Sequence, residues 1–140
     1  MIRLMADNMC VGHVDQLWTL CQSSPFLRDM LADLGVSLVR FHDVGLSANA
    51  DDREVRTVCR DGDILLLTID RKRGKDNSLQ AVLDEEARSD DFRNAVPVVT
   101  FSRLRLTKET RVFAYELVEL LQDIDVYRGT GRQYLPKNPA

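Results

Sequence analysis

The amino-acid sequence predicts an α/β domain built on a mainly parallel sheet, and three observations support this. The chain has 140 residues, which is the size of one compact domain with a single core. Short apolar segments of strand length alternate along it with longer segments of helical periodicity. The segment at residues 63–70 carries a continuous apolar run, which indicates a strand buried on both faces, as in a parallel sheet.

Four segments are predicted to be strands, because each is short, apolar and bounded by turn-forming residues. They span residues 2–6, 36–44, 63–70 and 96–101. Helical segments separate them, and strands joined by a helix pair in parallel through right-handed crossovers. We therefore expect one parallel sheet with a core that contains Leu4, Leu38, Leu65, Leu67 and Val98.

Apolar residues recur every three to four positions between the strands, which predicts helices there, the first of them beginning at Val11. Residues that favour helix N-caps precede the later helices, namely Ser24, Asp51, Asn77 with Ser78, and Thr107. Gly35 is expected to end the second helix, and the last helix is expected to reach Tyr127. Residues 129–140 contain glycine and proline, so we predict a single domain at residues 1–128 followed by a surface tail.

The composition excludes several classes of protein. With 44% hydrophobic residues and a net charge of −3, the chain is not of a disordered type and cannot hold nucleic acid by overall positive charge. Its three cysteines lack C-x-x-C spacing, which argues against a disulfide scaffold or a cysteine zinc site. No apolar run approaches the roughly 18 residues of a membrane span, and the N-terminal residues lack a signal-peptide core. We therefore expect a cytoplasmic protein without a membrane partner.

Acidic residues follow two of the predicted strands, Asp7 after the first and Asp70 after the third. The carboxyl ends of parallel strands share one edge, where such sheets bind ligands. The connecting loops can bring Asp52 and Asp76 to the same edge. Carboxylates that converge without a matching lysine repel one another and need a divalent cation between them. Because all the ligands would be oxygens, the pattern favours Mg²⁺ or Mn²⁺.

Each of these acids also has a structural alternative. Asp7 can belong to the turn after its strand, Asp52 can complement the dipole of the helix that it opens, and Asp76 can be a helix cap. Asp70 is hardest to explain in this way, because it ends a strand that is buried on both faces and needs a partner there. The metal-site hypothesis therefore depends on the coincidence of several positions rather than on one residue.

Basic residues crowd the loop between Asp70 and Asp76, namely Arg71, Lys72, Arg73 and Lys75. A second basic group follows the fourth strand, at Arg103, Arg105, Lys108 and Arg111. Both groups are expected near the carboxyl edge of the sheet. A carboxylate-bound metal with a cationic rim suits a phosphodiester hydrolase, because the metal activates water and the cations hold the flanking phosphates. Solubilising loop charges are the alternative interpretation.

The chain resembles the PIN-like proteins of bacteria, a fold of small metal-dependent ribonucleases found in many toxin–antitoxin systems, and more closely an uncharacterised PIN-like group. The matching stretches are residues 5–8 (MADN), 50–55 (ADDREV), 66–71 (LLTIDR), 74–79 (GKDNSL) and 128–136 (RGTGRQYLP). Each motif is short, so the resemblance depends on their order along nearly the whole chain.

The resemblance implies a three-layer α/β/α sandwich with a mainly parallel sheet of four to five strands. It implies an endoribonuclease in which Mg²⁺ or Mn²⁺ is bound by Asp7, Asp52 and Asp70, with Asp76 as a further catalytic acid. The RNA substrate would be held by Arg71, Arg73 and Lys75, and ligands or water would be hydrogen-bonded by Thr68 or Thr100. An antitoxin or a second copy of the chain would be the protein partner.

Two other functions are compatible with the sequence. A receiver-type signalling domain also has acids after its first and third strands and a threonine after its fourth, which here are Asp7, Asp70 and Thr100. That class normally adds a fifth strand with a lysine, and an acidic pair after the first strand, whereas Asn8 follows Asp7 here. The other alternative is a degenerate PIN-like fold that binds a partner protein and has no activity.

Overall fold

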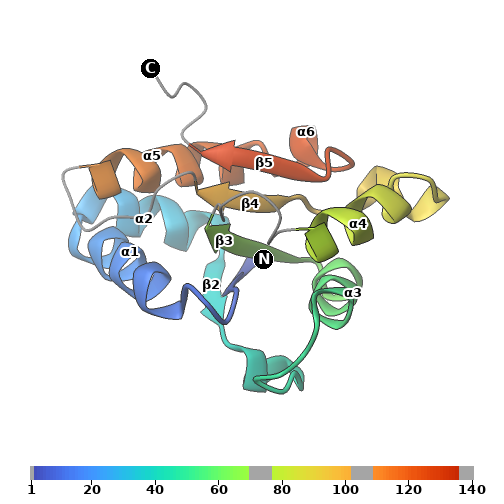
Figure 1. Ribbon diagram of the computed structural model, residues 1–140. Helices are drawn as coiled ribbons and strands as arrows, with labels where there is room; N and C mark the ends of the chain where they lie inside the picture. Colours follow the sequence, from blue (N-terminus) through green and yellow to red (C-terminus); the bar gives the residue numbers. More distant parts are fainter. Residues whose placement is uncertain (1, 70–76, 102–108, 136–140) are drawn as a thin grey trace.

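The computed structural model describes residues 2–69, 77–101 and 109–135 of the chain. It is an α/β structure around a five-stranded parallel sheet with the order β2-β1-β3-β4-β5 (Figure 1). The strands are β1 (Ile2–Ala6), β2 (Val36–Val39), β3 (Ile64–Ile69), β4 (Val98–Phe101) and β5 (Arg132–Leu135). The predicted fold class, with its parallel sheet, is confirmed.

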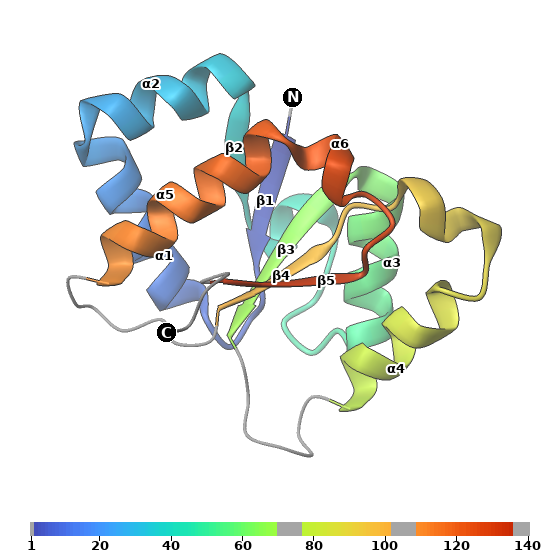
Figure 2. The ribbon, with the colours of Figure 1, turned by 90° about the horizontal axis from the view of Figure 1, so that it is seen from above.

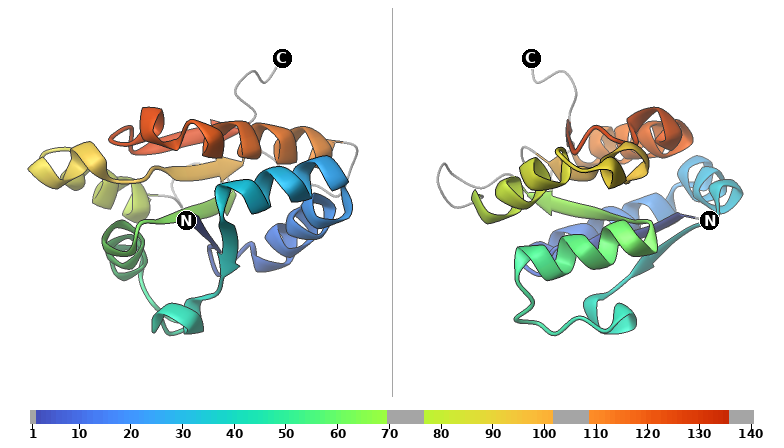
Figure 3. Two further views of the ribbon diagram at one scale, coloured as in Figure 1. Left: turned by 180° about the vertical axis from the view of Figure 1, so that it is seen from behind. Right: turned by 90° about the vertical axis from the view of Figure 1, so that its right-hand side faces the viewer.

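Helices cover both faces of the sheet and form the two outer layers (Figure 2). One layer contains α1 (Val11–Ser23), α2 (Pro25–Leu34) and α5 (Glu109–Gln122). The other contains α3 (Asp52–Gly62) and α4 (Asn77–Glu86). Three shorter helices lie in the connections, η1 (Phe41–Val44), η2 (Asp90–Asn94) and α6 (Ile124–Tyr127). Figure 3 shows the same layers from behind and from the side.

The central strand β3 contributes side chains to two separate cores. Leu65 and Leu67 pack into the core under α1, α2 and α5, whereas Ile64 and Leu66 pack into the core under α3 and α4. All four are at most 2% exposed, as a strand covered on both faces requires. Among the five predicted core residues on the strands, Leu38 is the one that stays partly exposed, because it lies on the edge strand β2.

The second strand is shorter than predicted. The sequence pattern suggested residues 36–44, but β2 ends at Val39 and η1 follows it. The carboxylate of Asp43 accepts a hydrogen bond from the backbone amide of Arg40 at 2.8 Å, and Gly45 ends the turn with a φ of 80°. This local side-chain bond competes with the sheet ladder, which is why the strand stops there.

The predicted surface tail is wrong for residues 132–135, which form the edge strand β5 beside β4. Gly131 O accepts a hydrogen bond from Val98 N at 2.9 Å, and Leu135 is fully buried in the core under α5. Gly129 has a φ of 80°, and a Cβ there would lie 2.9 Å from Arg93 O. A close turn therefore directs the chain back along the sheet. The domain extends at least to Leu135.

Two predicted caps are confirmed. Asp51 Oδ1 accepts a hydrogen bond from Glu54 N at 2.8 Å at the start of α3. Gly35 ends α2 in the left-handed conformation with a φ of 68°. The last predicted helix is interrupted at Asp123, with α5 ending before it and α6 beginning after it. Its predicted start at Thr107 lies outside the described residues.

Candidate active site

The strand order has a switch point beside β1 at the carboxyl edge of the sheet. The chain passes from β1 to β2 on one side of β1 and then crosses to β3 on its other side. Parallel sheets bind ligands at the point where the strand order reverses in this way. Asp7 directly follows β1, and its backbone amide donates to Leu67 O of β3 at 2.9 Å. The structure therefore places the first predicted acid at the carboxyl edge, beside the end of β3.

Asp52, the second predicted acid, is the first residue of α3. Its carboxylate accepts a hydrogen bond from Ser78 Oγ, in the first turn of α4. Both helices begin at the edge where β1 and β3 end (Figure 2). The positive ends of their dipoles therefore favour an anion at this edge.

The two predicted threonines lie side by side on β3 and β4. Thr68 Oγ1 and Thr100 Oγ1 are 2.9 Å apart, and both residues are almost completely buried. Arg132 Nη1 on β5 donates to Thr100 Oγ1 at 2.9 Å, so the proton of Thr100 is available to Thr68. Arg132 Nε donates to Gln80 Oε1 on α4 at 3.1 Å. A continuous polar chain therefore crosses from α4 to β3.

This polar chain faces the same side of the sheet as Asp7. Side chains alternate along a strand, so residues two apart share a face. Asp7, Thr68 and Thr100 each lie two positions beyond a residue of the core under α3 and α4. Those core residues are Met5, Leu66 and Val98.

Arg132 and Gln80 were missed by the sequence reasoning. Arg132 was assigned to the tail, although it belongs to the stretch 128–136 that carries the PIN-like resemblance. Its guanidinium lies 5.9 Å from the ring centroid of Tyr134, two residues further along the same face of β5. The alternation of Arg132 and Tyr134 with Gln133 and the buried Leu135 is the signal that could have identified this strand.

Cys59 lies in the core below the acids and is fully buried. Burial, with a smaller contribution from the carboxylate of Asp7, raises the pKa of its thiol to about 12, although Arg56 and Arg3 act in the opposite direction. The thiol is therefore protonated at neutral pH. In that state it is neither a good metal ligand nor a good nucleophile.

The described residues contain only part of the predicted metal site. Asp70 and Asp76, with Arg71, Arg73 and Lys75, lie outside the described residues. Within residues 2–69, 77–101 and 109–135, no three His, Cys, Asp or Glu side chains form a group that could hold a metal. Asp7 and Asp52 are hard oxygen donors that suit Mg²⁺ or Mn²⁺, but a complete site needs Asp70 or Asp76 as well.

The fold and this edge define the chain as a doubly wound parallel α/β domain with the strand order 2-1-3-4-5. Comparisons with protein-family models, with curated proteins and with solved structures found no match to the chain. In the described part of the chain, no helix has both the length and the apolar character to cross a bilayer.

Proposed function

We propose that the chain is a divalent-metal-dependent endoribonuclease of the PIN-like type, acting as a toxin that an antitoxin restrains. The observation that carries the proposal is the position of Asp7 at the carboxyl edge of the sheet, where its backbone amide donates to Leu67 O of β3. Asp52 begins α3 at the same edge. Asp70 follows β3 directly in the sequence, and Asp70 and Asp76 would complete the ligand set.

A Mg²⁺ or Mn²⁺ ion at this edge would lower the pKa of a bound water and stabilise charge on the leaving oxygen. The chain itself supplies the groups that hold the RNA. The N-termini of α3 and α4 favour its phosphates, and Arg132 adds a positive charge on the same face of the sheet. In this proposal Arg71, Arg73 and Lys75 add further positive charge around the metal site. Thr100, which is hydrogen-bonded to Thr68, orients the guanidinium of Arg132.

The strand order favours one second candidate, a receiver-type phosphoacceptor domain. Receivers share the order 2-1-3-4-5, and β5 supplies the fifth strand that this class needs. β5 carries Arg132 rather than a lysine, and Asn8 rather than an acid follows Asp7. Stable incorporation of phosphate from acetyl phosphate, without RNA cleavage, would identify this alternative.

The decisive experiment measures Mn²⁺ binding by calorimetry and cleavage of single-stranded RNA on the same preparations. We expect Asp7→Asn and Asp70→Asn to weaken Mn²⁺ binding at least about tenfold and to abolish cleavage. Asp29→Asn, which removes a carboxylate 71% exposed on α2, is the matched control and should behave as wild type. Thermal unfolding of each variant separates the loss of a ligand from the loss of the fold.

Equal Mn²⁺ affinity in the wild type, the two site variants and the control would refute the metal site. Binding of no Mn²⁺ by the wild type, with no cleavage at any metal concentration, would instead support a degenerate PIN-like fold that binds a partner protein.

A further inference from the structure

A cavity of about 270 Å³ lies beside Asp7 at the carboxyl ends of β1 and β2. Ala6 and Asn8, the chain neighbours of Asp7, both line it. α1 begins at Val11, another lining residue, so the positive end of its dipole borders the cavity. The rest of the lining comes mainly from residues 38–42, at the end of β2 and the start of η1, and from the segment that follows.

Arg40 and the carboxylate of Asp15 both line this cavity, and their ion pair holds the guanidinium in a fixed orientation. Its Nη2 donates to both carboxylate oxygens of Asp15 on α1, at 2.8 and 2.9 Å. Nε and Nη1 of Arg40 donate to no acceptor in the part of the chain that the structure describes. These N–H groups are therefore free for a bound anion, and a guanidinium with two free donors matches the geometry of a phosphate.

The remaining lining suits a flat, partly polar ring. Val11, Phe41 and Leu46 provide apolar surface, and the half-buried ring of Phe41 can stack on a planar ligand. Asn8 Nδ2 donates to Ala48 O at 2.7 Å, which fixes the amide and leaves its Oδ1 as an acceptor. Acceptor, aromatic ring and cation together match the base and the phosphate of one nucleotide.

We infer that this cavity binds a single nucleotide of an RNA strand, with the base against Phe41 and the phosphate on Arg40. The inference rests on the proposed ribonuclease function, and it names the substrate subsite next to the acids. Because Asp7 lies between two lining residues in the sequence, the cavity adjoins the carboxyl end of β1, where the proposed metal site begins.

The test is the binding of the four nucleoside 5′-monophosphates to the full chain in EDTA, measured by calorimetry. EDTA removes divalent cations, so the signal reports on the cavity and not on the metal site. We expect at least one nucleotide to bind, and Arg40→Ala to weaken it about tenfold through loss of a charge-assisted hydrogen bond. Ala48→Trp should block binding, because Ala48 is an exposed lining residue and the indole fills the cavity.

The matched control is Arg28→Ala, which removes an arginine of similar exposure, 53% against 46% for Arg40, from another surface ion pair. It should keep the wild-type affinity. The inference is overturned if no nucleotide binds the wild type, if Arg40→Ala equals the control, or if inorganic phosphate binds as tightly as the nucleotides.

Asp7→Asn separates this inference from the proposed function. We expect this variant to lose Mn²⁺ binding and RNA cleavage while it keeps nucleotide binding in EDTA. RNA cleavage by a wild type that binds no nucleotide overturns the cavity inference alone. Nucleotide binding by a wild type that binds no Mn²⁺ supports the cavity and overturns only the metal-dependent nuclease.

Discussion

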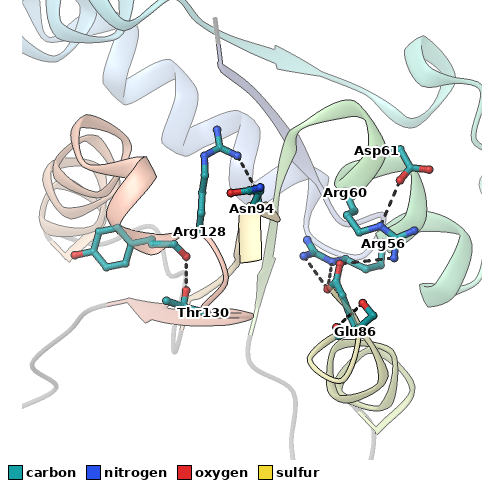
Figure 4. A network of polar contacts seen from close by, with 9 residues as sticks. Arg56, Arg60, Asp61, Glu86, Asn94, Arg128 and Thr130 are labelled. Carbon is teal, nitrogen blue, oxygen red and sulfur yellow. Dashed lines mark hydrogen bonds and ion pairs between the residues drawn. The ribbon is translucent and has the colours of Figure 1, made fainter. Parts of the chain in front are cut away.

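Arg56 and Glu86 form an ion pair buried between α3 and α4, with each side chain only 1% exposed (Figure 4). Arg56 Nε donates to Glu86 Oε2 at 3.0 Å, and Arg56 Nη2 lies 2.9 Å from the same oxygen. Arg60 Nη1 lies 3.8 Å from Glu86 Oε1 and is the nearest further cation. The pair therefore consists of two charges shielded from water. Substitution of Arg56 and substitution of Glu86 should lower the free energy of unfolding by different amounts.

Removal of one partner leaves an uncompensated buried charge, which costs about 3–5 kcal/mol. We expect Glu86→Leu to reach the upper part of this range, because it leaves the buried guanidinium of Arg56 without the carboxylate that it contacts. Arg56→Met should cost less, since Glu86 keeps Arg60 nearby at 3.8 Å. The double variant Arg56→Met/Glu86→Leu should come within about 1 kcal/mol of the wild type, because it buries no charge.

Urea unfolding measured by circular dichroism gives these free energies, and the fluorescence of Trp18, the single tryptophan, is a second probe. A loss of about 3–5 kcal/mol should lower the melting temperature of a domain of this size by roughly 10–15 °C. The control is Arg53→Met, which breaks an exposed pair between the same two helices, with side chains 59% and 53% exposed. It should hardly move the urea midpoint. The reasoning is refuted if Glu86→Leu is no worse than this control, or if the double variant is as unstable as the worse single variant.

Two further predictions concern the C-terminal segment. Arg128 holds the pKa of Asp63 below its usual value of 3.8 through hydrogen bonds of 2.7 and 3.1 Å. Arg128 also donates to Asn94 O at 3.0 Å (Figure 4). Because the folded pKa is depressed, the pair stabilises the fold above the unfolded pKa and stops doing so as the pH falls through the folded value. Asp63→Asn should therefore be less stable than wild type at pH 7 and equal to it once Asp63 is protonated, in urea unfolding at a series of pH values. Leu135→Ala should cost about 2–5 kcal/mol in the same assay, whereas a detached tail would make it neutral.

The parallel sheet could be predicted because its central strand is unambiguous. The run from Ile64 to Leu67 has no polar face, so only a strand covered on both sides can hold it. The limits of β2 could not be predicted in the same way. Val44 continues the apolar pattern beyond Val39, but the hydrogen bond from Arg40 N to Asp43 starts a turn instead. The periodicity of apolar residues does not reveal local side-chain hydrogen bonds of this kind.

The position of Asp7 at the carboxyl edge could be predicted from chain order alone, because a residue directly after a parallel strand lies at the ligand-binding edge. Asp7 is at that position by connectivity, and its amide bond to Leu67 follows from the pairing of β1 with β3. To predict the position of Asp52, one must also identify the cap at Asp51, which starts α3 at this edge. The nucleotide-sized cavity could not be predicted, because it depends on the turn at η1 and on the Arg40–Asp15 pair.

Arg132 shows that the strand order, more than proximity in the sequence, decides which charged side chains come together on this face of the sheet. It is separated by 32 residues from Thr100, yet its Nη1 bonds that buried hydroxyl because β5 pairs with β4. The strand order then places the two threonines on β3 and β4 and the guanidinium on β5, on the same face as Asp7, which directly follows β1. In the proposed ribonuclease, an RNA backbone that crosses this edge would meet an arginine at one end and carboxylates at the other. The carboxylate end can attract a phosphate only through a cation, which is why Mn²⁺ binding is the measurement on which the ribonuclease proposal depends.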